Sequence, residues 1–542
     1  MRSKGQHFLY FLFGVLAILL VFSVYKSYKY LQEKPGNQRQ PDAQFSSDTL
    51  TIIGSGEKLH LYPENIQYDS DVFVMNQIYQ GLVKLNMEMV EVPDLAKFWE
   101  LDSSRTYYRF YLRDDVRFHD GKPVMADDVI RSIERFLQSK DSDYLRNFFR
   151  IIEGAPDFIA GKSRRLPGLI KLSDKAVAIR LSHPSASFLK LLALPEVKIL
   201  PADYFAANKS RRNALPVGSG PYRVRQRTDS TLLLEAFRRK PEAPDGAWIK
   251  YVKILRLSPR ILKRYKAKQF DLSYYFIESY VDSLEDFSRI QLSGLNLSFL
   301  GINSRSALGK DVSLRRALYF AFHQDTLLQH YDILGKPVKN ISPLYLPNQS
   351  KTWIKLMPLY RTAKRTFLQK RKRRGATRRI TAKITVDTLN YSSAVPQLLR
   401  QGFARLDIPV QLVSYNTSSW NQELHVLKNS DVFYVSWTLD LPDPEFFFEP
   451  FFRSDSKLNL MNYRSKKVDS LLAVAAREKN LNNRLNIYEQ IEMILMQDLP
   501  VIPLYASTEN LIFRNNLHGI HLNRMGLPSL YLADIWKEHN PK

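Results

Sequence analysis

Residues Leu95–Leu137 place the strongest constraint on the fold, because they contain the patterns of a strand, a tight turn and a helix in succession. Along Tyr107–Leu112 every second residue is suited to a core, which is the two-residue period of a half-buried strand. The stretch His119–Lys122 reads His-Asp-Gly-Lys and predicts a turn. A helix with one apolar side follows, and Ala126 or Asp127 is expected to cap it.

A second strand ends abruptly within Asp431–Pro444, which reads DVFYVSWTLDLPDP. Apolar and polar residues alternate up to Thr438, and Pro442 and Pro444 cannot continue a sheet because proline has no amide hydrogen. Asp440 therefore lies just past a strand end, where a side chain can face a cleft. A core strand followed by an ordinary Asp-Pro turn explains the same residues, so this segment alone leaves both interpretations open.

The size and composition indicate a globular protein with more than one lobe. The chain has 542 residues, of which 44% are hydrophobic and 12% aromatic, enough for two or three lobes. It has no cysteine. This excludes disulfides, thiolate metal sites, a cysteine nucleophile and a lipid attached through an N-terminal cysteine. The absence of thiols is compatible with an oxidising compartment.

The N-terminal segment predicts a membrane helix. Residues Phe8–Tyr25 form an uncharged run of 18 residues, which as a helix is about 27 Å long and matches the hydrocarbon core of a bilayer. We interpret it as an uncleaved anchor, since a cleavage site with small residues is not evident; a processed signal peptide is the alternative. Lysines on both sides of the run leave its orientation open. Residues 31–48 would form a tether.

The positive charge of the chain raises the question of an anionic partner. The formal net charge is +25, and residues 361–383 contain eleven basic residues and no acidic one. Such a block suits nucleic acid or anionic lipid headgroups, but a basic surface helix has the same composition. No DNA- or RNA-binding motif accompanies the block. We therefore expect no specific nucleic-acid partner.

Several motifs follow one another in an order typical of one known family. They are Asn76–Leu82, Trp99–Val129, Pro216–Val224, Phe299–Asn303, Leu314–Leu318, Ser436–Pro444 and Pro500–Tyr505. In this order the chain resembles the family 5 extracellular solute-binding proteins, which are the dipeptide, oligopeptide and nickel receptors of ABC importers. The matches span roughly residues 50 to 535.

The resemblance implies an α/β, two-lobed periplasmic-binding-protein fold of the hinged class II type, with an extra subdomain and one preceding transmembrane helix. Residues 1–46 would be the anchor or signal segment and tether. Lobe 1 would comprise residues 47–270, with the extra subdomain at 67–175, and the chain would return to it at 488–542. Lobe 2 would comprise residues 271–487.

The chain also departs from the family pattern. Gln80 stands where the family usually has an acidic residue, and His323 and Gln324 stand where it often has Asp-Arg. The basic block at 361–383 replaces a segment that is usually acidic. Because there is no lipid-bearing cysteine, any membrane attachment must come from residues 8–25.

Catalytic and metal-binding interpretations are weak. Ser219 lies in a Gly-Ser-Gly loop that does not satisfy the nucleophile-elbow spacing, and no histidine partner is indicated. His323 and His330 would be about 10.5 Å apart on a helix, too far to share an ion readily. Asp127 and Asp128 suit a helix N-terminus without any chemistry. We expect no enzyme activity, no metal site and no cofactor.

The resemblance implies a ligand site around Asp440. In peptide-binding members the aspartate of this motif meets the ligand's α-ammonium, and Trp437 would cover the first residues of the ligand. The strand amides near Ser436 and Thr438 would pair with peptide main chain. The expected ligand-binding residues are Asp440, Trp437, Ser436, Thr438, Gln80 and Gly81, whereas Asp443 is expected to be a turn residue.

Two functions are compatible with these features of the sequence. The first is a monomeric periplasmic receptor, anchored to the cytoplasmic membrane by residues 8–25 or cleaved and soluble, that captures a short peptide or similar solute by hinge closure and delivers it to an inner-membrane permease. The second is an anchored, non-transport interaction protein with a basic surface for anionic lipid, cell wall or nucleic acid. The ligand's length, and whether a metal complex replaces the peptide, stay open.

Overall fold

The computed structural model describes residues 49–139, 143–204, 215–240, 246–275, 285–306, 308–322, 335–344, 346, 349–373, 381–387, 394–415 and 420–538. The expected membrane helix at 8–25 lies outside these ranges, as do His323, Gln324 and His330. Within these ranges no helix combines the length and the apolar character that a membrane span requires. The fold described below belongs to residues 47–542, which form one compact unit.

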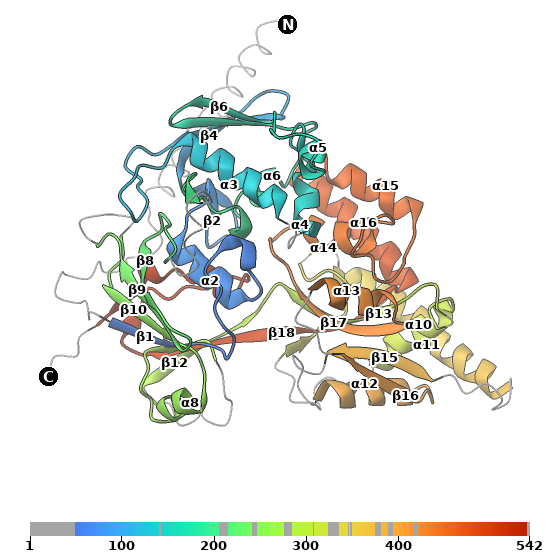
Figure 1. Cartoon of the computed structure of the whole chain (residues 1–542). Helices are drawn as coiled ribbons and strands as arrows, with labels where there is room; N and C mark the ends of the chain where they lie inside the picture. The colour runs from blue at the N-terminus through green and yellow to red at the C-terminus, as the bar shows by residue number, and fades with distance from the viewer. Residues whose placement is uncertain are drawn as a thin grey trace, which may run out of the picture. The chain divides into compact units, whose positions relative to one another are not determined.

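Twelve of the described strands form one large mixed sheet (Figure 1). Its order is β16-β15-β17-β13-β18-β11-β1-β10-β9-β8, and β12 and β14 also pair with β18. The first half-sheet consists of β1 (Thr49–Ile53), β8 (Tyr222–Arg227), β9 (Thr231–Ala236), β10 (Tyr251–Leu255), β11 (Leu272–Ser273) and β12 (Phe287–Ser293). The second half-sheet consists of β13 (Asn296–Ile302), β14 (Gly335–Pro337), β15 (Ala382–Asp387), β16 (Val410–Tyr415) and β17 (Val432–Thr438).

Strand β18 (Val501–Arg514) belongs to both half-sheets. Its beginning pairs antiparallel with β13, and its end, from Thr508 onward, pairs antiparallel with β12. Figure 1 shows β18 running from one group of strands to the other. Since β12 leads into β13 through Gly294 and Leu295, two adjacent segments of chain connect the half-sheets.

Residues 83–199 add smaller sheets and a group of helices. Strands β4 (Ala96–Leu101), β5 (Tyr107–Leu112), β7 (Ala176–Arg180) and β6 (Leu169–Ser173) form a four-stranded antiparallel sheet, and β2 (Val83–Leu85) pairs with β3 (Glu91–Pro93). The helices are α3 (Ala126–Gln138), α4 (Asp143–Phe148), α5 (Ala155–Ile159) and α6 (Phe188–Leu191), with short 3-10 helices η2 (Phe149–Ile151) and η3 (Pro195–Val197).

The remaining elements are mainly helices, some of which pack on the large sheet. They are η1 (Pro63–Asn65), α2 (Asp69–Ile78), α8 (Pro259–Lys266), α10 (Val312–Phe322), α11 (Gln349–Arg373), α12 (Ala394–Ala404), α13 (Trp420–Lys428), α14 (Glu445–Phe452), α15 (Lys466–Ala475), α16 (Leu481–Asp498), β19 (Leu517–His518), η4 (Leu527–Ser529), η5 (Leu532–Asp534) and β20 (Trp536–Lys537). The helices that pack on the large sheet include α2, α10 and α12. The basic block at 361–383 includes the C-terminal part of α11.

The predicted strand, turn and helix within Leu95–Leu137 are present. Exposure alternates along β5, where Tyr108, Phe110 and Leu112 are buried. The predicted cap of α3 is wrong: the helix begins at Ala126, and Met125 occupies the cap position. Asp128 stabilises this end because its Oδ2 accepts the Met125 amide at 2.7 Å.

The Gly-Ser-Gly loop has a structural role. A Cβ atom at Gly218 would lie 2.0 Å from the Ile78 carbonyl oxygen, and one at Gly220 would lie 2.5 Å from the Gln77 carbonyl oxygen. Glycine is therefore required for the close approach to α2. His119 packs against the same loop, with its Nε2 3.0 Å from the Gly220 carbonyl oxygen, and burial lowers its pKa to about 4.

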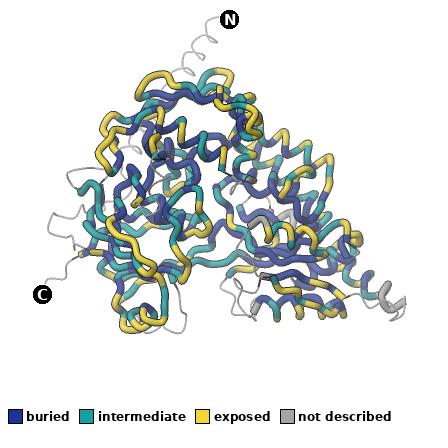
Figure 2. The backbone as a smooth tube through the Cα atoms, in the orientation of Figure 1, coloured by how far each residue is buried: buried dark blue, intermediate teal, exposed yellow. Residues whose placement is uncertain are grey.

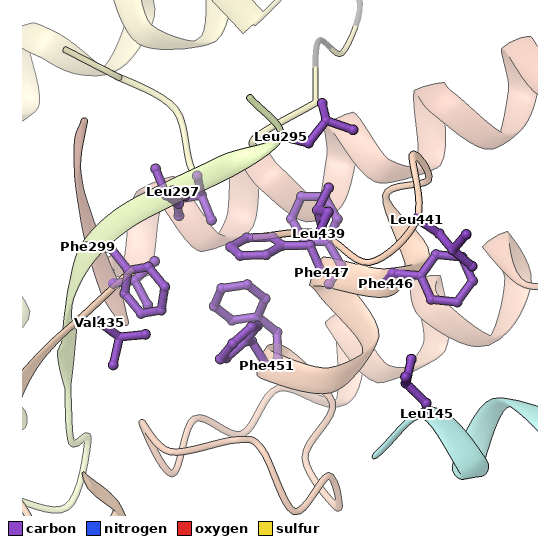
Figure 3. Close-up of a cluster of buried hydrophobic side chains, with 14 of the residues drawn as sticks. Leu145, Leu295, Leu297, Phe299, Val435, Leu439, Leu441, Phe446, Phe447 and Phe451 are labelled. Carbon is purple, nitrogen blue, oxygen red and sulfur yellow. The ribbon is translucent and has the colours of Figure 1, made fainter. Parts of the chain in front are cut away.

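Buried apolar side chains form two main clusters (Figure 2). The larger cluster combines residues 82–199 with residues 295–505, and the second combines 50–79, 200–272 and 511–535. Figure 3 shows the larger cluster near α14, where Leu145 of α4 joins Leu441 and Phe446. Phe148 also packs on Phe446 with 4.8 Å between ring centroids. The lobe boundaries expected from the sequence remain predictions.

Candidate functional site

Strand β17 carries the candidate site at its C-terminal end. It pairs antiparallel with β13, and the pairing continues one residue further because the Leu439 amide donates to the Leu295 carbonyl oxygen at 2.8 Å. The strand is confirmed, but its first four residues are all buried, so the alternating sequence does not correspond to one exposed face. The prolines end the strand as predicted, and α14 begins directly after Pro444.

A buried ion pair fixes the turn after β17. Arg484 of α16 donates to both carboxylate oxygens of Asp443, at 2.6 and 2.8 Å, and to Glu445 Oε2 at 2.8 Å. Ser187, from the segment before α6, also donates to Glu445 Oε2 at 2.8 Å. Asp443 lies in the turn as predicted, and it also forms this ion pair, which the sequence did not predict. The network holds the loop that carries Asp440.

Asp440 is partly buried and faces Tyr144 of α4. The Tyr144 hydroxyl donates to Asp440 Oδ2, and the Trp437 ring meets the Tyr144 ring edge-on at 5.6 Å. Burial raises the pKa of Asp440 to about 6; the Tyr144 hydrogen bond opposes this shift, and the charge of Asp69 adds to it. The pKa of Tyr144 is raised well above its ordinary value, first by burial and then by Asp440, so Tyr144 is a neutral donor.

Two more carboxylates, Glu196 and Asp69, interact electrostatically with Asp440, and a third, Glu509, interacts with Asp69. Glu196 in η3 is 8% exposed, and its Oε2 has no hydrogen-bond partner in the described part of the chain. Burial and then the charge of Asp440 raise the pKa of Glu196 to about 8. Burial and then the charge of Asp69 raise the pKa of Glu509, in β18, to about 7. We refer to Asp69, Glu196, Asp440 and Glu509 as the acidic cluster.

Asp69 and Arg135 define the surroundings of the acidic cluster. Asp69 begins α2 and keeps accessible surface, yet removal of water by the surrounding protein, together with Asp71, raises its pKa. Arg135 is the cation that acts on Glu196. Its guanidinium donates to Glu64 Oε2 at 2.9 Å and to the main-chain oxygen of Glu196 at 2.8 Å. Glu64 therefore already neutralises Arg135.

The other predicted site residues have different surroundings. Ser436 Oγ accepts a hydrogen bond from Ser298 Oγ at 3.0 Å, and Thr438, at the strand end, is exposed. Gln80 and Gly81 follow α2, where the Gln80 side chain and the Gly81 amide both donate to the Asp94 carboxylate, at 2.8 and 2.9 Å. The structure thus brings Trp437 and Asp440 together around Tyr144, whereas Gln80 and Gly81 belong to a separate buried network.

Two other features bear on what the site can hold. In the described ranges no group of three or more His, Asp or Glu residues is arranged to bind a metal ion. A small hollow lies elsewhere, beside β9 and β10, with Leu59, Arg227, Arg256 and Tyr274 among the residues that line it. It contains none of the expected ligand-binding residues, so the site is assigned from carboxylate chemistry and contacts.

Comparisons with known proteins identify the family of the fold. The model of the family described as bacterial extracellular solute-binding proteins, family 5 Middle, matches residues 91–459. The dipeptide-binding protein of Escherichia coli K12 is 24% identical, over 89% of this chain and 94% of that protein. The periplasmic oligopeptide-binding protein OppA of Salmonella typhimurium is 24% identical, over 90% and 92%. These comparisons do not favour the anchored interaction protein.

A solved structure shares the fold. The murein tripeptide binding protein MppA of Escherichia coli matches with a TM-score of 0.73 and 19% identity, over 92% of this chain and all of that chain. The predicted two-lobed α/β binding-protein fold is therefore confirmed.

We predict that Arg484→Met lowers the free energy of unfolding by about 3–5 kcal/mol, because it leaves Asp443 and Glu445 buried without their cation. Differential scanning calorimetry would measure the change. The control is Arg477→Met, an exposed arginine just after α15, which should change stability by about 0.5 kcal/mol or less. Equal effects of the two substitutions would contradict a buried network that holds the turn.

We predict that Glu196→Gln stabilises the ligand-free protein increasingly as the pH rises from 5 to 8.5. Because the folded-state pKa of Glu196 is raised from 4.5 to about 8, the wild type has its full stability below 4.5 and loses it as the pH rises through about 8. At about 1.4 kcal/mol per pKa unit the difference reaches at most about 5 kcal/mol. Melting temperatures of both proteins across this range would test it.

The matched control for this titration is Glu153→Gln, which removes an exposed carboxylate paired with Arg180 at 3.4 Å. Its melting temperature should differ from the wild type by an amount that does not change with pH. A pH-independent difference for Glu196→Gln as well would show that Glu196 is ionised in the folded protein throughout this range.

Proposed function

Because this chain belongs to family 5 of the bacterial extracellular solute-binding proteins, we propose that it captures short peptides and delivers them to the permease of an ABC importer. The relatives support this proposal, since they include dipeptide- and oligopeptide-binding proteins matched over about nine tenths of the chain. Capture would proceed by closure of the two lobes around the peptide, with β18 and the β12–β13 connection as the hinge. No bond is broken in this function, so the protein is not an enzyme.

The carboxylate of Asp440 is the observation on which the ligand class rests. It is partly buried, and in the described part of the chain it forms no ion pair; its side-chain donor is the neutral Tyr144 hydroxyl. A carboxylate in such surroundings gains most from a cation that also donates hydrogen bonds. The α-ammonium of a peptide is such a group, and it would therefore bind at Asp440.

The Tyr144 hydroxyl and a ligand ammonium can share this carboxylate. Tyr144 occupies Oδ2, and a carboxylate has about four acceptor positions on its two oxygens. Tyr144 would then orient Asp440 while the ammonium supplies the missing charge. Trp437, which packs on Tyr144, would cover the first residues of the peptide.

The main chain and the remaining predicted residues complete the proposed site. Strand amides near Ser436 and Thr438 would pair with peptide main chain, which gives affinity without strict side-chain preference. Gln80 and Gly81 would contribute by positioning the end of α2 through Asp94. No metal or cofactor takes part, and the protein would act as a monomer.

The location follows from the family and from the N-terminal segment. We propose that the protein works in the periplasm and that residues 8–25 anchor it to the cytoplasmic membrane, where the permease lies; a cleaved, soluble form is the alternative. Release of the full-length chain by osmotic shock without detergent would contradict the anchor.

We predict that Asp440→Asn weakens binding of the tripeptide Ala-Ala-Ala on the order of 100-fold, because a charge-assisted hydrogen bond worth about 2–3 kcal/mol is lost. Isothermal titration calorimetry would give the dissociation constants. The wild type should discriminate in the same way against N-acetyl-Ala-Ala-Ala, which has no ammonium.

The control variant is Asp431→Asn, an exposed aspartate just before β17, which should bind as the wild type does. If Asp440→Asn binds the free-amine peptide with unchanged affinity, the ammonium contact is not at Asp440. If the wild type binds none of a set of di- to pentapeptides, peptide capture itself is wrong.

A further inference from the structure

The acidic cluster is unusual in a chain with a formal net charge of +25. One peptide ammonium needs one counter-charge, and Asp440 provides it. The cluster contains three further carboxylates close enough for their charges to interact: Glu196 with Asp440, and Asp69 with both Asp440 and Glu509. The site therefore has more carboxyl groups than the α-ammonium of a peptide requires.

Glu196 is the member of this cluster that most clearly lacks a partner. Glu196 is 8% exposed, and its Oε2 has no hydrogen-bond partner in the described part of the chain. Its charge acts on both Asp440 and Tyr144, so Glu196 lies within electrostatic range of the Asp440 carboxylate. A buried carboxylate oxygen without a donor is costly, and such atoms occur where a ligand completes the site.

The neighbouring cation does not neutralise Glu196. Arg135 donates to the Glu64 carboxylate and to the Glu196 main-chain oxygen, and neither contact involves the Glu196 carboxylate. Two other members of the acidic cluster already accept hydrogen bonds: Asp440 accepts one from the Tyr144 hydroxyl, and Glu509 accepts one from the Leu527 amide at 2.9 Å. In the described part of the chain no donor reaches Glu196 Oε2, so this oxygen is available to a donor of the ligand.

We propose that the preferred ligand carries two cationic groups, and that Glu196 is a specificity-determining residue that meets the second group while Asp440 meets the first. This inference rests on the proposed capture of peptides. A peptide whose first residue is lysine or arginine has the required charges, one on the main chain and one on the side chain. A diamine has the same chemistry from another source.

The test compares three ligands on the full chain by isothermal titration calorimetry at pH 8. Lys-Ala-Ala has both cations, norleucine-Ala-Ala has a similar shape with the α-ammonium alone, and cadaverine is a diamine without a peptide. The wild type should bind Lys-Ala-Ala at least about tenfold more tightly than norleucine-Ala-Ala, as expected for one additional charge-assisted contact.

Substitutions test whether Glu196 causes the preference for Lys-Ala-Ala. In Glu196→Gln the ratio of the two tripeptide dissociation constants should fall to about two or less, whereas Glu153→Gln, which removes an exposed charge elsewhere, should keep the wild-type ratio. Asp69→Asn, at the exposed start of α2, should leave the ratio unchanged, because its charge acts on Asp440, which meets the ammonium of both tripeptides. A melting temperature of Glu196→Gln at or above that of the wild type guards against a folding defect.

The outcomes separate this inference from the proposed function. If the wild type binds both tripeptides equally well, or if Glu196→Gln keeps the full ratio, the second cationic contact is wrong while peptide capture stands. If cadaverine binds in a Glu196-dependent manner and neither tripeptide binds, the two-cation inference holds and peptide capture is wrong. If none of the three ligands binds, both are wrong.

Discussion

The candidate site depends on one buried ion pair, between Arg484 and Asp443. Two charged groups that are 3% and 4% exposed must satisfy each other, because neither can be neutralised by water. The pair fixes the turn in which β17 ends and α14 begins, and so fixes the direction of Asp440. The same guanidinium holds Glu445, which accepts a hydrogen bond from Ser187. The turn is thereby connected to the segment before α6, and Phe446 of α14 packs on Phe148 of α4, the helix that carries Tyr144.

The surroundings of Asp440 explain how the candidate site would select a cationic ligand. In the acidic cluster, Glu196 is buried and Asp440 and Glu509 are partly buried, and the pKa of each is raised by burial, so the ligand-free protein is destabilised when they ionise. A cationic ligand removes that cost as it binds, and the energy favours the conformation in which both lobes contact it. β18 can transmit a movement from one half-sheet to the other, because this one continuous strand belongs to both.

The sequence predicted those parts of the fold and site that local patterns determine. The period of β5, the turn after it and the prolines beyond β17 lie within short segments, and these elements are confirmed. The resemblance of the ordered motifs to the family, rather than a local pattern, led to Asp440 as a ligand contact, which stays a prediction. Tyr144 and Glu196 were missed because tertiary contacts place them; Tyr144 is 296 residues from Asp440, and no spacing marks either residue. The cap of α3 was missed because Met125 caps through its backbone while Asp128 supplies the side chain.

Asp440 is proposed as the counter-charge for an amine of the ligand, and a crystal structure of the full-length protein with a bound lysine-containing tripeptide would show whether it is. We expect the α-ammonium nitrogen to lie within hydrogen-bonding distance of the Asp440 carboxylate, roughly 2.7–3.0 Å, with Tyr144 still in contact. A peptide bound elsewhere, or bound with its carboxylate or an apolar side chain against Asp440, would show that Asp440 is not this counter-charge.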